Sequence, residues 1–445
     1  MREQWSTSAQ HWLVNNYSGE APTGNAPGLD AIIGRTVPII PMNNSAPDPR
    51  VEFSIRLATA LHRYGTPAHR LELMMNMAMR RLGLEGQFFA LPTGIFASFG
   101  TPQEHRTSLI RTDMSEVDLE RMSLLDELAE NVSSGQIGPE EGTDVIEKIV
   151  AAPPRYPAWL TVLCFSISSA TATRFFGGGW RELVAAGAIG TVIGILAILL
   201  GKSENTRRVF EIIAAIVAAM LAALAAYLFS PFSIYVTTLA SLIILLPGLT
   251  LTTGMTELAT GNLVSGTARL TGAVLVLLGL AFGAALGGQI AALLPAVRGS
   301  GTPVSLPAWT LWLLLLTTPI TFAVLLKARL SDIPWAALGC LLSFIGSRAG
   351  AAGLGPPLGA FMGAILLGVG ANIFMLLKKR PSAVPMLPGL ILLVPGSIGF
   401  GSMSKFIQDD VIAGLEGAFN VALVAVALVT GLLMANVIVP PRRAL

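Results

Sequence analysis

The sequence predicts an α-helical polytopic membrane protein with about ten transmembrane helices in two inverted five-helix repeats, preceded by a cytoplasmic α+β domain. Of the 445 residues, 53% are hydrophobic and only 13% are charged, about half the charged share of an ordinary soluble domain. After residue 156, apolar stretches of about 18 residues or more recur, which is the length needed to cross a bilayer. Short motifs also recur at a fixed spacing in this region, which indicates an internal repeat.

The charges divide the chain into a soluble part and a membrane part. Residues 1–155 hold 13 of the 29 Lys and Arg and 19 of the 27 Asp and Glu. Their first stretch lacks the basic-then-apolar pattern of a secretory signal, so we expect this part to stay in the cytoplasm. The predicted units are a disordered tail (1–47), a cytoplasmic α+β domain (48–155), two five-span membrane repeats (156–298 and 299–440) and a cytoplasmic tail (441–445).

Capping signals set the elements of the cytoplasmic domain. Asp48-Pro49 and Thr66-Pro67 each predict a helix start, with ends near Gly65 and Gly83. Ser115 with Asp118 resembles a capping box and opens a helix to Ser134, and Pro139 opens another. Between these pairs, β-prone runs separated by turns that contain Pro and Gly predict a small antiparallel sheet from Phe88–Leu91, Ile95–Phe99 and Thr107–Arg111.

Ten spans follow, and their loops alternate in basic charge. The spans are 157–175, 180–200, 209–229, 233–253, 260–294, 307–326, 333–348, 356–377, 384–403 and 409–438. A cytoplasmic N-terminus places the base-rich ends, with residues such as Arg155, Lys327 and Lys378, inside. Both termini are therefore predicted to be cytoplasmic.

Two motif pairs define the repeat. Pro157-Ala158-Trp159 recurs as Pro307-Ala308-Trp309, and Leu246-Pro247-Gly248 recurs as Val394-Pro395-Gly396. Each half then holds five spans, and an odd number forces the second copy to cross the membrane upside down. Inverted repeats are typical of secondary transporters, whose substrate site lies near the midplane between the copies.

The two Pro-Gly pairs predict helix breaks inside apolar spans, because proline removes a backbone donor and glycine permits unusual dihedral angles. Amides at the start of a half-helix favour a carboxylate, and nearby hydroxyls can bind a substrate side chain. We expect the substrate site among Pro247, Gly248, Thr250, Thr252, Thr253, Pro395, Gly396 and Ser397. The alternative is that each break is a simple kink.

Few ionisable residues lie at membrane depth, where a charge is costly. The repeat aligns Arg269 beside Glu416, so we expect these two to pair. Glu416, well inside an apolar span, is the first candidate for the coupling proton. Glu257 and Asp410, expected nearer water, are the next candidates.

Several classes of site are not predicted. Cys164 and Cys340 lie in apolar segments and suggest neither a disulfide nor a zinc site. The histidines have no metal-ligand spacing, and neither a phosphate-binding loop nor a G-x-S-x-G elbow is present. We expect no metal, no cofactor, no nucleic-acid partner and no enzyme activity, so transport would draw on an ion gradient.

The chain resembles the bacterial threonine/serine exporter family in several motifs. These are Gly65-Thr66-Pro67-Ala68-His69-Arg70-Leu71-Glu72, Pro92-Thr93-Gly94-Ile95, Asp118-Leu119-Glu120-Arg121, Pro154-Arg155-Tyr156-Pro157, Gly177-Gly178-Gly179-Trp180-Arg181, Val394-Pro395-Gly396-Ser397-Ile398-Gly399-Phe400 and Gly414-Leu415-Glu416. The resemblance covers about residues 50 to 440. It implies a ten-span, proton-coupled exporter of small hydroxy amino acids with both family modules fused. The family leads us to expect arginine where this chain has Gly401.

The resulting hypothesis is an antiporter in the bacterial cytoplasmic (inner) membrane that exports threonine or serine against inward proton flow, with the oligomeric state left open. A dicarboxylate exporter is the first alternative, with Arg269 as the substrate clamp. A remote alternative is a peptide hydrolase fused to a pore, with His69, Glu72 and Asp118 as candidates. The resemblance marks eight motif residues of the cytoplasmic domain: His69, Arg70, Glu72, Pro92, Thr93, Gly94, Asp118 and Arg121.

Overall fold

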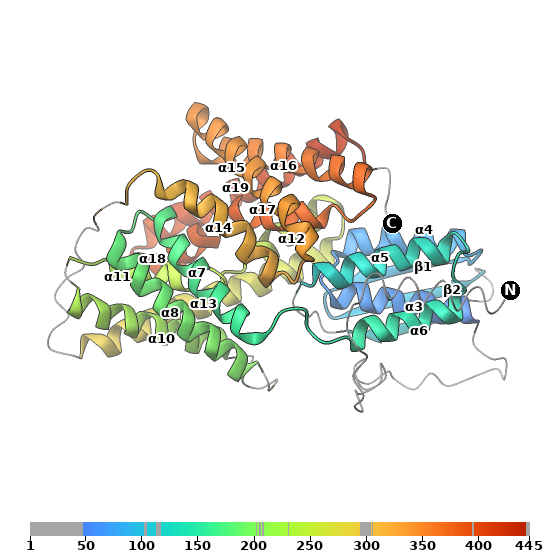
Figure 1. The fold of residues 1–445 in the computed structure, drawn as a ribbon, viewed down its shortest axis with the longest axis horizontal. Coiled ribbons are helices and arrows are strands. Elements are labelled where there is room, and N and C mark those ends of the chain that lie inside the picture. The colour runs from blue at the N-terminus through green and yellow to red at the C-terminus, as the bar shows by residue number, and fades with distance from the viewer. Residues whose placement is uncertain are drawn as a thin grey trace.

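The computed structural model describes residues 48–441 except 102–104, 113–116, 202, 204–205, 207–208, 230, 294–303, 305 and 394–395 (Figure 1). The predicted tail over 1–47 and residues 442–445 lie outside the described part of the chain. Figure 1 shows a small N-terminal region that contains the sheet beside a larger region of helices.

The small region, here called the N-terminal domain (residues 48–155), combines four helices and a sheet. The helices are α3 (Pro49–Arg63), α4 (Ala68–Arg81), α5 (Leu119–Ser133) and α6 (Pro139–Ala151). The strands β1 (Gly86–Leu91), β2 (Gly94–Gly100) and β3 (His105–Arg111) pair antiparallel in that order. At the start of α5 the capping residue is Asp118, whose carboxylate accepts from the amide of Arg121 at 2.9 Å, and Ser115 lies outside the described residues.

The register of the sheet places alternate residues in the domain core. Phe88 pairs with Ala97, and Ile95 pairs with both Ala90 and Ile110. All five side chains are buried in one cluster with residues of α3, α4, α5 and α6. The sheet and the four helices therefore share a single core, as expected from the alternating pattern of a strand with one buried face.

The larger region, here called the membrane body (residues 156–441), contains two successive sets of helices. The first set is α7 (Ala158–Phe175), α8 (Trp180–Leu200), α10 (Phe210–Leu228), α11 (Ile234–Ser241), α12 (Gly248–Ala259) and α13 (Leu263–Ala292). The second set is α14 (Thr310–Leu325), the 3-10 turn η1 (Leu330–Asp332), α15 (Ile333–Leu354), α16 (Pro356–Lys378), α17 (Ala383–Leu393), α18 (Gly396–Ile407) and α19 (Val411–Ile438).

Seven segments of the described chain are long and apolar enough to cross a membrane, so the protein is a polytopic membrane protein. They are Trp180–Leu200, Phe210–Leu228, Leu263–Ala292, Leu330–Gly353, Pro356–Lys378, Ala383–Ile407 and Val411–Ile438. The remaining three expected spans correspond to α7, to the shorter apolar helix α14, and to α11 and α12 together.

Small residues let the long helices approach closely. A Cβ placed on Gly283 of α13 would lie 2.6 Å from the carbonyl oxygen of Ile212 in α10. A Cβ on Gly431 of α19 would lie 2.6 Å from the carbonyl oxygen of Phe361 in α16. Because lipid provides no hydrophobic drive for helix association, such close backbone packing is a main source of stability in a membrane body.

The turns at one end of the membrane body contact the N-terminal domain. The amide of Leu119 donates to the carbonyl of Leu326 at 2.9 Å, after α14. Arg70 donates to the Ser382 hydroxyl, before α17, at 3.1 Å. These turns lie at the ends that the charge pattern assigns to the cytoplasm. The opposite end holds Trp180 and Trp309, whose ring centroids are 6.3 Å apart.

Candidate functional site

The helix is interrupted at the position that Pro247-Gly248 predicts. Helix α11 ends at Ser241, residues 242–247 turn, and α12 begins at Gly248 with Pro247 as its N-cap. In the second half α17 ends at Leu393 and α18 begins at Gly396. Pro395 itself lies outside the described residues.

The first residues of α12 and α18, the helices that follow the two breaks, lie next to each other. A Cβ placed on Gly396 would lie 3.3 Å from the Cβ of Leu246 and 3.5 Å from the Cα of Gly248. Both glycines are buried. The first residues of α12 and α18 are therefore in contact in the interior, although 148 positions separate them in sequence.

This contact brings together two ends that carry positive helix dipoles. The first i to i−4 bond of α12 runs from the Leu251 amide to the Pro247 carbonyl at 3.0 Å. The amides of Leu249 and Thr250 precede it, so no acceptor within the helix is available to them. Two such helix starts at one place form a setting that suits an anionic group.

The hydroxyl side chains after the two helix breaks differ in burial. Thr252 is buried and donates to the Gly248 carbonyl at 3.2 Å, so its hydroxyl is already used within α12. Thr250 and Thr253 of α12, and Ser397 of α18, are half-buried. These three hydroxyl side chains retain some access from outside the helix core.

Glu257, near the end of α12, is fully buried and bound from three sides. Its carboxylate accepts from Arg269 Nε at 2.9 Å, from Ser265 Oγ at 2.8 Å and from the amide of Ala68 at 2.9 Å. Arg269 is also buried. Ala68 is the first residue of α4, so the N-terminal domain directs the start of a helix at this carboxylate.

Two expectations about the charges are wrong. Arg269 pairs with Glu257 rather than Glu416, and Glu257 lies in the interior rather than near water. The physical reason is the tight turn at Gly261, which has φ +89° and folds α13 back along α12. The close approach of Gly254 and Gly266 then places Arg269 next to the acid of its own hairpin.

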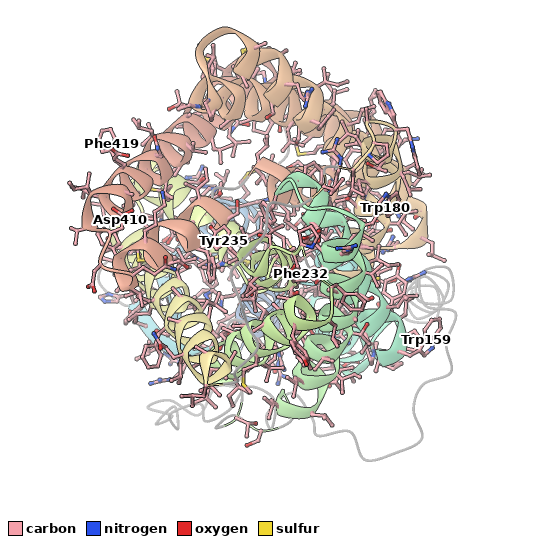
Figure 2. The ribbon with its side chains drawn as sticks, turned by 90° about the vertical axis from the view of Figure 1, so that its left-hand side faces the viewer. Trp159, Trp180, Phe232, Tyr235, Asp410 and Phe419 are labelled. Carbon is pink, nitrogen blue, oxygen red and sulfur yellow. The ribbon has the colours of Figure 1, made fainter. Side chains whose placement is uncertain are left out.

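The other two acids proposed for the proton lie at the surface of the structure. Glu416 is exposed on α19. Asp410 is exposed and caps α19 by accepting from the amide of Ala413 at 3.2 Å. In the view of Figure 2, Asp410 lies towards the edge of the molecule, whereas Phe232 and Tyr235 lie near the middle of the face shown.

Two motif residues of α4, Arg70 and Glu72, connect the N-terminal domain to the membrane body. Arg70 reaches Ser382, as described above. Glu72 accepts from the Ala90 amide at 2.8 Å and from the Asn262 side chain at 3.2 Å. His69 Nδ1 is buried and makes no hydrogen bond within the described residues. Burial lowers the pKa of His69, and the nearby Glu257 opposes this shift.

The remaining motif residues hold the domain together. Pro92 and Thr93 form the turn between β1 and β2, and Gly94 starts β2. Burial raises the pKa of Asp118, partly offset by its bond from the Arg121 amide. Arg121 lies over the ring of Tyr64, 5.2 Å from the centroid.

Two residues of the hydrolase alternative serve separate structural contacts. Glu72 binds β1 and Asn262, and Asp118 caps α5. No described group of three His, Cys, Asp or Glu could hold a metal ion.

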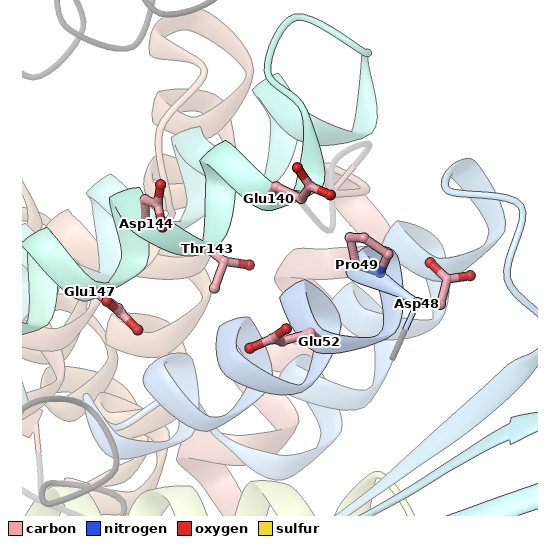
Figure 3. Close-up of a pocket in the computed structure, with 7 residues that line it drawn as sticks. All are labelled: Asp48, Pro49, Glu52, Glu140, Thr143, Asp144 and Glu147. Atoms are coloured by element: carbon pink, nitrogen blue, oxygen red, sulfur yellow. The ribbon is translucent and has the colours of Figure 1, made fainter. Parts of the chain in front are cut away.

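An acidic hollow of about 490 Å³ lies between α3 and α6 (Figure 3). It is lined by Asp48, Pro49, Glu52, Glu140, Thr143, Asp144 and Glu147. Arg50 pairs with Asp48 at 2.7 Å, and Arg56 pairs with both Glu52 and Glu147 at 3.1 and 3.0 Å. Arginines thus balance part of its charge, and we assign no ligand to it.

Gly401, where the family resemblance leads us to expect arginine, lies next to an aromatic hydroxyl. A Cβ placed on Gly401 would lie 2.9 Å from the Tyr235 hydroxyl. Tyr235 belongs to α11, so this contact joins the broken span of the first half to α18. Sequence patterns do not reveal this contact, because it joins elements far apart in the chain.

Comparisons with known proteins place the chain among its relatives. Two family models, both described as threonine/serine exporter, match residues 52–291 and 312–438. Pheromone-regulated membrane protein 10 of Saccharomyces cerevisiae is 28% identical over 92% of this chain and 53% of its own length. The protein of that name in Candida albicans is 30% identical over 81% of this chain and 33% of its own length.

The chain thus spans about half the length, or less, of these curated relatives. No solved structure shows a significant match to it. The two family models together cover most of the chain, and they match the N-terminal domain with the first half of the membrane body, and then the second half. The chain therefore belongs to the threonine/serine exporter family.

Proposed function

We propose that the protein is a proton-coupled secondary transporter that exports threonine and serine from the cytoplasm. Family membership supports the substrate class. The observation that carries the mechanism is the contact between the helix starts at Gly248 and Gly396. A zwitterionic amino acid would place its carboxylate at these two helix N-termini, where backbone amides and helix dipoles favour negative charge.

The two halves of the membrane body act as inverted repeats of five spans in this proposal. Helices α12 and α18 each have 12 residues and start at glycines 148 positions apart. Helices α13 and α19 also start 148 positions apart, at Leu263 and Val411. Ten spans with both termini in the cytoplasm follow, and the N-terminal domain then covers the cytoplasmic ends of the spans.

The contacts of Glu257 favour this residue as the site of the coupling proton. Its carboxylate holds Arg269, Ser265 and the start of α4 at once. Protonation removes the charge that binds Arg269 Nε, which frees Arg269 and loosens the α4 contact. Glu416 and Asp410 stay as the alternatives that the sequence suggests.

The membrane in which the protein works is part of the proposal. The relatives named above are yeast membrane proteins, whereas the motif resemblance favours a bacterial cytoplasmic membrane. In either case the N-terminal domain belongs on the side from which substrate is taken up. Reporters fused to each terminus should be active only as cytoplasmic reporters.

Dicarboxylate export is the second candidate, and one observation favours it. Two helix N-termini at one place would suit two carboxylates as well as one. Arg269, the expected clamp of such a substrate, is however bound to Glu257. Arg269 could act on a dicarboxylate only after Glu257 has been neutralised.

Counterflow in proteoliposomes with labelled threonine, serine and succinate tests both candidates. We expect threonine and serine, but not succinate, to exchange. Gly248→Leu and Gly396→Leu should each abolish exchange, since a side chain there fills the contact between the helix starts. Gly288→Leu is the matched control, because a Cβ on Gly288 meets nothing within 4 Å. Normal exchange by both site variants would contradict the proposed site.

A further inference from the structure

Four buried hydroxyls in the membrane body make no hydrogen bond within the described residues. They are Ser168 of α7, Thr238 of α11, Thr318 of α14 and Ser343 of α15. All four are at most 5% exposed. A hydroxyl buried without a partner costs free energy, so each such group needs an explanation.

Neighbouring hydroxyls on the same helices behave differently. Thr171 donates to the carbonyl of Ser168 at 2.9 Å, and Thr321 donates to the carbonyl of Thr318 at 2.9 Å. Thr237 likewise donates to the Ser233 carbonyl at 2.9 Å. Bonding to the preceding turn is the usual way in which a helix satisfies such groups, and the four hydroxyls above depart from it.

Ser168 and Thr318 are equivalent positions of the repeat. The motif Pro157-Ala158-Trp159 matches Pro307-Ala308-Trp309 at an offset of 150, and the same offset relates Ser168 to Thr318. The partnered hydroxyls Thr171 and Thr321 are related by it too. One pattern, a free hydroxyl followed three residues later by a satisfied one, therefore occurs in both halves.

The packing of α7 against α14 places the two free hydroxyls at similar depth. At one end Arg174 donates to the Thr310 hydroxyl at 3.1 Å, and at the other end Tyr156 donates to the Ala328 carbonyl at 2.7 Å. These contacts fix an antiparallel register in which Ser168 is level with residue 316. With a rise of about 1.5 Å per residue, Ser168 and Thr318 then differ by about 3 Å along the helices.

This level also adjoins the first helix break. The hydroxyl of Ser169 donates to the carbonyl of Ser241 at 3.3 Å, and Ser241 is the last residue of α11 before the chain turns. Leu246, within that turn, contacts Gly396. On the other helix, Pro319 follows Thr318 and has no amide proton, so the Leu315 carbonyl loses its helical donor.

We propose that Ser168 and Thr318 form a subsite that binds the side-chain hydroxyl of the substrate, and that they select β-hydroxy amino acids over apolar ones of equal size. This inference rests on the proposed function and names the residues that set its specificity. A hydroxyl can both donate and accept, so one substrate oxygen can bond to both side chains. Rejection of an analogue follows because the methyl group of valine would leave both hydroxyls unpaired.

The test measures competition between threonine and valine in counterflow by the full-length protein in proteoliposomes. Wild type should prefer threonine. Ser168→Ala and Thr318→Val should each reduce the ratio of threonine to valine transport by at least about tenfold. Ser168→Thr, which keeps a hydroxyl, should retain the preference. Thr171→Val and Thr321→Val are the matched controls and should leave the ratio within about twofold, because their hydroxyls serve the helix backbone.

Different results identify which proposal fails. An unchanged ratio in Ser168→Ala and Thr318→Val, or an equal change in the controls, overturns the subsite while leaving threonine export intact. Exchange of no amino acid by wild type overturns the proposed function and the subsite with it. Should a variant be too unstable to reconstitute, the shift of its melting temperature by threonine against valine in detergent gives the same comparison.

Discussion

The hairpins α12–α13 and α18–α19 share one backbone plan. Each starts at a buried glycine and turns back through a residue with positive φ, Gly261 with +89° and Asp409 with +62°. In each turn an amide donates to a carbonyl five residues earlier, from Asn262 to Glu257 at 2.8 Å and from Asp410 to Lys405 at 3.0 Å. The turns of the two hairpins therefore match at positions 148 residues apart.

The side chains of the two hairpins differ completely in charge and burial. Glu257 is buried, pairs with Arg269 and accepts a hydrogen bond from the first amide of α4. Its counterpart Lys405 is exposed, and the counterpart of Arg269 is Gly417. One hairpin thus contains a buried ion pair and contacts the N-terminal domain, whereas no such ion pair is found among the described residues of α18 and α19.

The two hairpins therefore have similar turns but different charges, and the buried ion pair of Glu257 and Arg269 lies in the hairpin that contacts the N-terminal domain. Four changes, taken from the largest expected effect to the smallest, test whether the hairpin α12–α13 differs from α18–α19 in function as well as in structure.

Removing Arg269 should have the largest effect. Arg269→Met leaves the Glu257 charge buried with its main partner lost, which typically destabilises a protein by about 3–5 kcal/mol. Lys405→Met, the change on the opposite hairpin, should leave stability within about 0.5 kcal/mol because that residue is exposed. Thermal unfolding in detergent measures both.

A double variant separates charge from packing in that result. Glu257→Gln with Arg269→Met removes both charges and should recover much of the lost stability, since no unpaired charge then remains buried. Equal destabilisation of the double and the single variant would show that Arg269 acts through its packing alone.

Neutralising Glu257 should uncouple transport from the proton gradient. Glu257→Gln keeps the shape of the side chain and an oxygen that can accept from Ala68, but removes the proton site. We expect this variant to exchange threonine for threonine while accumulating at least about tenfold less in response to an imposed pH gradient, an effect of about 1.4 kcal/mol. Glu416→Gln should behave as wild type. The reverse outcome would assign the proton to Glu416 and restore the prediction made from sequence.

Local signals predicted most of the fold. The caps at Asp48 and Pro139, the glycine turns and the Pro247-Gly248 break act within a few residues of the chain, so their positions agree with the observed helix and strand ends. The family was recognisable for the same reason, because its motifs are short and contiguous.

The candidate site was predicted less well, because its partners are set by tertiary packing. Nothing near Glu257 in sequence indicates that the amide of Ala68 binds it, since 189 residues separate the two. The glycine at position 261 was the available signal that α13 turns back onto α12 and brings Arg269 within reach. The repeat suggested Glu416 instead, because an alignment of halves says nothing about contacts within one hairpin.

Loosening the contact between α4 and Glu257 should have a smaller effect. Ala68→Pro removes the amide that donates to Glu257, and proline is tolerated at a first helical position. The loss of a hydrogen bond to a charged group is worth about 1.5–3 kcal/mol. We expect faster hydrogen exchange in α4 and earlier proteolysis of the N-terminal domain.

The matched control makes the same change at another alanine that follows a proline and begins a helix. Ala158 follows Pro157 and is the first residue of α7, as Ala68 follows Pro67, but it is exposed. Ala158→Pro should therefore leave exchange in α4 unchanged. A similar increase in both variants would mean that proline acts on the helix start and not on the contact with Glu257.

The smallest effect concerns His62, a buried histidine of α3. Its Nε2 lies 2.7 Å from the Leu91 carbonyl and its Nδ1 lies 3.0 Å from the Thr112 hydroxyl. The neutral ring meets both contacts, with Nε2 donating and Nδ1 accepting. Burial lowers the pKa of His62, the Leu91 bond raises it, and the more distant charges of Arg269 and Glu257 act in opposite directions.

The sign of the pH dependence follows from this lowered pKa. Between the folded pKa and the ordinary histidine pKa of 6.5, the unfolded state binds more protons than the folded state. Stability therefore rises with pH across that interval, and is lost as the pH falls from 6.5 towards the folded pKa. His62→Gln should remove this contribution to the pH dependence of the unfolding temperature, whereas His105→Gln, at the exposed start of β3, should not. A matching loss in Arg269→Met would show that the ion pair of Glu257 and Arg269 acts electrostatically on His62 in the domain core. An unchanged pH profile in His62→Gln would exclude His62 as the source of this pH dependence.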